Sequence, residues 1–115
     1  MDFKNSKGLR KDKEFRKVYQ RGKSFANKYL VIYIMKNNLD DNRLGISVSK
    51  KIGKAIIRNK VKRRIREAYR LHIDEKLTIN GYDIIFIARK PSSDCSYTDI
   101  EKSVISLFKK SNLYK

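Results

Sequence analysis

The sequence contains few of the residues on which most metal and covalent sites depend. Its 115 residues include one cysteine, Cys95, one histidine, His72, one proline and no tryptophan. A single cysteine excludes an intrachain disulfide, and two such side chains cannot supply the four ligands of a structural zinc site. No run of 18 apolar residues occurs, so we expect no membrane-spanning helix, and the polar, lysine-rich start is unlike a signal peptide. We therefore expect a cytoplasmic protein.

Acidic residues are also scarce. Asp and Glu number 12 against 29 Lys and Arg, which gives a net charge of +17 and a pI near 10.1. This charge exceeds the roughly 2 to 8 units that keep a small domain soluble. Because self-repulsion destabilises a compact chain, such a charge predicts a polyanionic partner. Nucleic acid is the first candidate, and an anionic membrane is the second.

Glycine and proline are too rare to form an interdomain linker, with five and one copies, and no internal repeat is present. Apolar runs such as YLVIYIM and YDIIFIA can supply a core. We therefore expect one domain over residues 1–115.

The order of elements predicts an α+β fold, a single-domain α/β sandwich. A short helix, KEFRKVYQR, follows Asp12 as N-cap and closes at Gly22. Residues 29–36 and 43–49 are expected to form two strands that pair antiparallel. A helix over residues 56–74 precedes a strand over 82–89, whose continuous apolar run suits burial on both faces. Residues 98–101 resemble a capping box that begins the last helix. The predicted order is α-β-β-α-β-α.

The helix over residues 56–74 separates its apolar side chains from its charges. At 3.6 residues per turn, Ile57, Ile65 and Ala68 fall within about 40° of Val61. The opposite arc carries cations and one amide: Asn59, Lys62, Arg63, Arg66 and Arg70. A merely solvated helix usually alternates charge signs to gain i,i+4 pairs, but between residues 50 and 70 the only acid is Glu67. The pattern therefore favours a surface that binds a polyanion. Guanidinium groups match phosphate oxygens in pairs, which favours nucleic acid.

Aromatic side chains that stack on unpaired bases would complete a single-strand site. Phe15, Tyr19 and Tyr33 are candidates, although aromatic residues on a short helix and a strand are equally consistent with core packing. If the even-numbered residues of strand 29–36 face the packed helices, Tyr33 faces the other side of the sheet.

The residues themselves leave several classes of protein open. A Cys95–His72 dyad is not excluded by geometry, but no third member or oxyanion-binding feature is recognisable. A ribosome-associated RNA binder, a protein-only nuclease, a membrane-active cationic chain and a DNA-binding helix remain alternatives. Overall, the sequence indicates a polyanion-binding domain with no visible catalytic set.

Residues 47–70, SVSKKIGKAIIRNKVKRRIREAYR, resemble the signature of the bacterial ribonuclease P protein component. The segments LRKDKEFRKVYQRG, IIFIARKP and SLFKKSNLYK resemble flanking segments of the same family, so the likeness spans nearly the whole chain. The resemblance implies an α/β sandwich with an unusual left-handed βαβ crossover, against the usual right-handed rule.

The resemblance also implies a function. Such a protein is the non-catalytic subunit of an endoribonuclease whose RNA removes the 5′ leader of precursor tRNA, with Mg²⁺ held by the RNA. The implied partners are the ribonuclease P RNA and precursor tRNA, with no membrane and no obligate protein partner. Residues expected to contact RNA are Lys50, Lys51, Arg58, Asn59, Lys62, Arg63, Arg66 and Arg70. Residues expected to line a cleft for the single-stranded leader are Phe15, Tyr19 and Tyr33.

Overall fold

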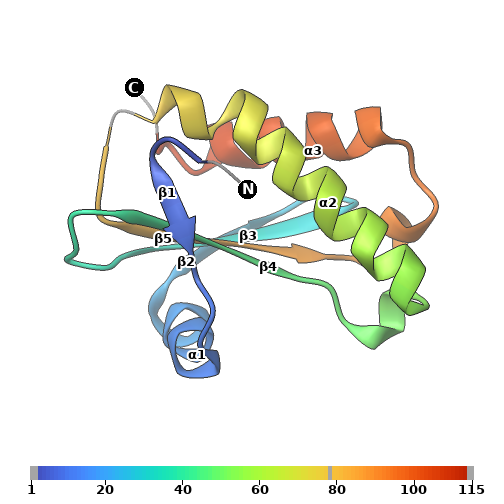
Figure 1. Cartoon of the computed structure of the whole chain (residues 1–115), viewed down its shortest axis with the longest axis horizontal. Helices are drawn as coiled ribbons and strands as arrows, with labels where there is room; N and C mark the ends of the chain where they lie inside the picture. The colour runs from blue at the N-terminus through green and yellow to red at the C-terminus, as the bar shows by residue number, and fades with distance from the viewer. Residues whose placement is uncertain (1–2, 78, 114–115) are drawn as a thin grey trace.

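The computed structural model describes residues 3–77 and 79–113, which form one mixed sheet with helices on both faces (Figure 1). The helices are α1 (Asp12–Arg21), α2 (Ala55–His72) and α3 (Tyr97–Lys110). The strands are β1 (Ser6–Gly8), β2 (Lys23–Ala26), β3 (Leu30–Lys36), β4 (Asn42–Ser47) and β5 (Tyr82–Ala88). Short 3₁₀ turns are η1 (Lys50–Ile52), η2 (Asp74–Lys76) and η3 (Lys90–Ser93). The α+β class and the six predicted elements are confirmed, and β1 and β2 are additional edge strands.

The strand order is β1-β4-β5-β3-β2. β3 pairs antiparallel with β5, whereas β4 pairs parallel with β5 on its other side. The predicted antiparallel pairing of the strands at 29–36 and 43–49 is therefore wrong, because β5 lies between them. The physical reason is the apolar run of β5: Ile84 and Phe86 are buried on one face and Ile85 on the other, so this strand gains most at the centre of the sheet.

Two layers of helix cover the sheet unequally. Figure 1 shows α2 and α3 side by side over one face and α1 alone across the other. The larger core lies under α2 and α3, and it includes Leu30, Ile32 and Ile34 of β3. The smaller core lies under α1, around Val18 and Ile85. Side chains that alternate along β3 thus separate into the two cores, as period-two geometry requires.

The starts of α1 and α3 differ from the prediction. Asp12 is the first residue of α1 and Lys11 is its N-cap. In α3 the capping box is formed by Ser96 and Asp99, so the N-cap is two residues before the predicted Thr98. The Asp99 N–H donates to Ser96 Oγ (3.1 Å), and the Ser96 N–H donates to Asp99 Oδ2 (3.2 Å). Glu101, expected to close the box, instead contacts His72 Nε2 at 2.7 Å. That contact joins α3 to the end of α2.

A buried carboxylate fixes the N-terminal segment against the end of α2. Asp74 is fully buried, and its carboxylate accepts bonds from the Lys4 N–H (2.6 Å), the Asn5 N–H and the Ser6 hydroxyl (2.6 Å). The Tyr69 hydroxyl lies 2.7 Å from the same Ser6 oxygen. These bonds hold the chain directly before β1 in place, which positions β1 on the edge of β4.

We expect Asp74→Asn to lower the free energy of unfolding by about 1–2 kcal/mol, because a neutral amide turns one acceptor oxygen into a donor that faces other donors. Urea denaturation measures the difference. Asp40→Asn is the control: Asp40 is exposed, and its change should stay within about 0.5 kcal/mol. Equal losses in the two variants would contradict a specific role for the Asp74 network.

Candidate nucleic-acid interface

The apolar side of α2 is buried as its periodicity predicted. Val61, Ile65, Ala68 and Tyr69 have no exposed surface. Burial of a Val or Ile side chain, such as Val61 or Ile65, contributes about 1.5–3 kcal/mol relative to an exposed one. This burial fixes the rotation of α2 about its axis, so that the opposite, cationic side must face away from the core.

Four residues form what we call the α2 cationic face: Asn59, Lys62, Arg63 and Arg66. Asn59 and Arg63 are exposed, and Lys62 and Arg66 are half-buried. Within residues 3–77 and 79–113, none of these four side chains has a hydrogen bond or ion pair to the protein. Their polar groups are therefore available to an external partner without breaking contacts of the fold.

Three other arginines of α2 do have protein partners. Arg58 Nη1 donates to the Gly53 carbonyl and Arg64 Nη1 donates to the Cys95 carbonyl, both at 2.9 Å. Arg70 Nη2 lies 2.6 Å from Glu67 Oε1, and this hydrogen bond lowers the pKa of Glu67. Because the two side chains are 33% and 41% exposed, the pair contributes little stability. Arg58 and Arg70 thus lie on the predicted surface but are partly engaged.

The predicted lysines Lys50 and Lys51 lie in η1, directly before α2, and both are exposed. Next to them, Lys90 Nζ donates to the Ile52 carbonyl (3.2 Å), which ties η3 to η1. The structure therefore brings these lysines to the N-terminal end of the α2 cationic face, where they extend its positive charge.

The three predicted aromatic residues come together between α1 and the sheet. The ring centroids of Phe15 and Tyr19 are 6.2 Å apart, and those of Tyr19 and Tyr33 are 5.1 Å apart in an edge-to-face arrangement. All three are half-buried around Val18 and Ile85. They both complete the smaller core and present ring surface beside it.

A groove of about 570 Å³, which we call the α1 groove, opens between α1, β4 and α2. Its lining residues are Arg10, Asp12, Phe15, Arg16, Tyr19, Ile46, Ser47, Val48 and Lys62. Phe15 and Tyr19 thus line it directly, whereas Tyr33 packs behind the ring of Tyr19. The lining has several cations and one carboxylate, which suits a negatively charged chain with stacking bases.

Arg10 and Arg16 line the groove but were not singled out from the sequence. The sequence gives little indication of their role, because each lies in a segment where basic residues are common.

Gly45 of β4 shows why Phe15 can lie close to the sheet. A Cβ at this position would come within 2.6 Å of Cζ of Phe15. The glycine in strand β4 therefore allows the Phe15 ring to lie directly on the sheet.

A charged network holds α1 in position over the sheet. Arg43 of β4 donates from Nε and Nη2 to both carboxylate oxygens of Asp83 (2.7 and 2.8 Å) and also pairs with Glu14 of α1. Asn37 Nδ2 donates to the same Asp83 (2.9 Å). Burial would raise the pKa of Glu14, but the Lys11 N–H and Arg43 outweigh it, and the pKa is lowered. Glu14 therefore stays ionised at neutral pH, and its ion pair with Arg43 holds α1 against the sheet.

The two side chains that could form a catalytic dyad each contact a different part of the fold. His72 contacts Glu101, and the Cys95 thiol donates to the Ser92 carbonyl (3.4 Å), so neither is directed at the other. In the described part of the chain no three His, Cys, Asp or Glu side chains cluster closely enough to hold a metal ion. Nor does any helix among those residues combine the length and apolar content needed to cross a membrane.

These features define a class: a small cationic α+β protein with an uncompensated helix face next to an aromatic groove. A model of the family described as "Ribonuclease P" matches residues 3–112. The chain belongs to the ribonuclease P protein family, the protein component of an endoribonuclease that acts in tRNA processing.

Relatives agree in sequence and in structure. The ribonuclease P protein component of Clostridioides difficile is 63% identical over 113 residues, which cover 98% of each chain. The protein of Clostridium botulinum (strain Langeland) is 58% identical over 92% of this chain and 95% of its own. The solved Staphylococcus aureus RNase P protein superposes with a TM-score of 0.84 at 40% identity, covering 94% of this chain and 97% of that one.

Proposed function

We propose that this protein binds the ribonuclease P RNA through the α2 cationic face and the single-stranded 5′ leader of precursor tRNA through the α1 groove. The observation that carries the proposal is the position of Lys62. This residue belongs to the α2 cationic face and also lines the α1 groove. The two surfaces are therefore contiguous, and one protein can contact both RNA molecules at their junction.

The chemistry of the α1 groove supports a single strand rather than a duplex. Phe15 and Tyr19 present rings on which bases of any identity can stack, for about 1–3 kcal/mol per base. Arg10, Arg16 and Lys62 surround them with charges that attract phosphates. A site of this kind accepts leaders of different sequence, because stacking and phosphate contacts do not read base edges.

In this proposal the RNA performs the hydrolysis, and Mg²⁺ is bound through the RNA subunit. The protein screens the repulsion between two polyanions, strengthens leader binding and lowers the Mg²⁺ concentration that the RNA needs. We further propose that it acts in the cytoplasm with no membrane and no obligate protein partner. The family resemblance also supports a left-handed β4–α2–β5 crossover, and an experimental structure would test this hand.

The test compares the affinities of precursor and mature tRNA for the ribonuclease P RNA, with and without the protein. We expect the protein to tighten binding of the precursor much more than binding of the mature tRNA, because only the precursor carries a leader. Cleavage of the precursor at low Mg²⁺ should require both subunits. An equal gain for the two tRNAs would contradict leader binding, and cleavage by the protein alone would contradict catalysis by the RNA.

A further inference from the structure

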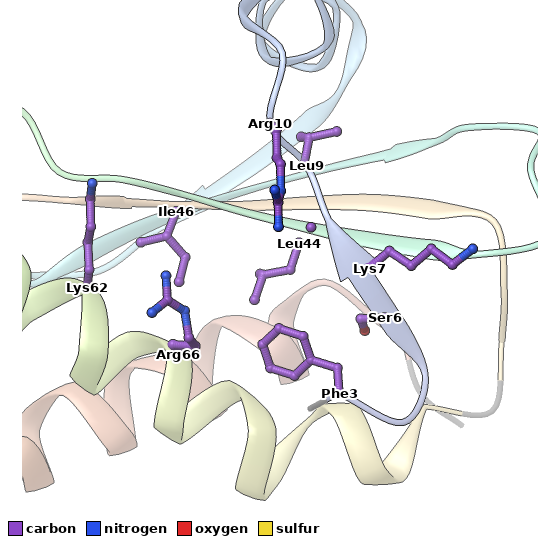
Figure 2. A pocket seen from close by; sticks show the side chains of 10 residues that line it. Phe3, Ser6, Lys7, Leu9, Arg10, Leu44, Ile46, Lys62 and Arg66 are labelled. Atoms are coloured by element: carbon purple, nitrogen blue, oxygen red, sulfur yellow. The ribbon is translucent and has the colours of Figure 1, made fainter. Parts of the chain in front are cut away.

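A second groove, of about 530 Å³, lies between the N-terminal segment and α2 (Figure 2). We call it the β1–α2 groove. Its lining residues are Phe3, Ser6, Lys7, Gly8, Leu9, Arg10, Leu44, Ile46, Lys62 and Arg66. This groove is distinct from the α2 cationic face and from the α1 groove, because much of its wall comes from the N-terminal segment.

The walls of this groove differ in chemistry. Phe3, Leu44 and Ile46 supply apolar surface, and Figure 2 shows Arg10 descending from one side toward Lys62 and Arg66, which rise from α2. No acidic residue is among its lining residues. An apolar wall with a cationic rim complements a nucleotide, whose base is flat and weakly polar and whose phosphate is anionic.

The groove is held open by contacts within the protein. Its N-terminal wall is anchored through the Asp74 network, and the Phe3 ring packs edge-to-face on Tyr69 with centroids 5.4 Å apart. A ligand therefore meets a largely preformed site and loses little affinity to ordering it.

The edge of β4 is open where the groove runs along it. The last residue of β1 that pairs with β4 is Gly8, which lies opposite Leu44. One further hydrogen bond follows, from the Leu9 N–H to the Leu44 carbonyl (2.8 Å). Beyond this bond the chain turns away into α1, so β1 does not cover the edge of β4 beside Ile46. Ile46 lines both grooves, as do Arg10 and Lys62. The two grooves therefore meet at these three residues.

We propose that the β1–α2 groove binds the leader nucleotides that lie farther from the cleavage site than those in the α1 groove. The direction rests on the proposed RNA contacts of Lys50 and Lys51 in η1, since the RNA subunit holds the cleavage site in this proposal. Val48, in the α1 groove, is two residues from Lys50, whereas Leu44, in the β1–α2 groove, is four residues farther along the chain from these lysines. A base lies against Phe3 and Ile46, and its phosphate lies among Arg10, Lys62 and Arg66. This inference rests on the proposed leader binding and extends it to longer leaders.

Two substitutions separate this groove from the rest of the surface. Phe3→Leu removes the aromatic ring that lines the β1–α2 groove but not the α1 groove, and it keeps an apolar side chain there. Gly8→Leu adds a side chain to the groove with no change of charge, and a Cβ at this position meets only the flexible Arg10 side chain, at 3.3 Å. Phe25→Leu is the matched control, because it removes the same kind of half-buried ring from β2, where the side chain lines neither groove.

The experiment measures affinity for precursor tRNAs with leaders of increasing length, using protein preassembled with saturating ribonuclease P RNA. In the wild type, affinity should rise with leader length and then level off. Phe3→Leu and Gly8→Leu should match the wild type for short leaders, level off at a shorter length, and bind long leaders about tenfold more weakly, because a stacking platform is lost or covered. Phe25→Leu should keep the wild-type dependence on length.

Each alternative result has a separate meaning. If both groove variants keep the wild-type dependence, the β1–α2 groove does not hold leader, although the α1 groove still does. If they weaken binding equally at every length, the groove serves the RNA subunit and the inference is overturned. If the wild type itself shows no dependence on leader length, the proposed function fails. If circular dichroism shows that Gly8→Leu does not fold, the comparison of Phe3→Leu with Phe25→Leu decides.

Discussion

Replacing Lys62, Arg63 and Arg66 together with alanine is expected to weaken binding of the ribonuclease P RNA about 100-fold near 0.1 M salt. These side chains have no partner among the described residues, so each is free to contact a phosphate. Three ion pairs with phosphate at a protein surface, at roughly 1 kcal/mol each, account for the loss. The salt dependence should change as well: the slope of log K against log salt should become shallower by roughly 2 to 3, since fewer counterions are released.

The control removes the same charge from elsewhere. Lys102, Lys109 and Lys110 are exposed on α3, and their triple alanine variant loses three positive charges without touching the α2 cationic face. We expect its affinity to fall by only a fewfold, through the smaller net charge. Equal losses in the two variants would mean that RNA binding depends on the overall charge of the protein. The assignment of the α2 cationic face as the RNA-binding surface would then be wrong. Unfolding curves for both variants check that the fold is kept.

Replacing Phe15 and Tyr19 together with leucine is expected to weaken binding of precursor tRNA roughly 30-fold or more while leaving mature tRNA unchanged. Two stacking platforms are lost, each worth about 1–3 kcal/mol. Leucine keeps apolar volume against Val18 and Ile85, so α1 should stay on the sheet. The measurement is equilibrium binding of both tRNAs to the holoenzyme at one fixed salt concentration.

Tyr19→Phe is the matched control for the aromatic prediction. It keeps the ring and removes only the hydroxyl, so precursor affinity should stay within about twofold of the wild type. Burial raises the pKa of Tyr19, so the native hydroxyl carries no charge at neutral pH, and its removal leaves the charge of the groove unchanged. A drop in mature tRNA affinity that matched the drop for the precursor would show that the leucine variant damages the protein rather than the leader site.

Much of the interface follows from local sequence. The positions of Val61, Ile65 and Ala68 along α2 determine which side of the helix is buried, and hence that Asn59 and Arg63 are exposed. Alternation along β3 likewise placed Tyr33 on the face opposite Leu30 and Ile32, as expected. Both results depend on the 3.6- and 2-residue periods of the backbone, which any short window of sequence reveals.

Other features could not be obtained in this way. The short strands β1 and β2 have three and four residues and no clear alternation, so they carry no local signal. The position of β5 between β3 and β4 depends on which arrangement buries the most apolar surface over the whole chain. The cap of α3 is a different case, because Ser96 with Asp99 and Thr98 with Glu101 have the same local spacing. The structure uses Ser96 with Asp99, and Glu101 contacts His72 of α2.

The sequence by itself determined the amphipathic helix α2 and its uncompensated cationic face, because both are properties of neighbouring residues on one element. Only the tertiary structure decided that Arg10, Ile46 and Lys62 meet where two grooves join, since those residues come from the loop before α1, from β4 and from α2. The physical reason is that a groove is bounded by long-range contacts. Its walls form only when helices pack on both faces of one sheet and β1 stops short along the edge of β4.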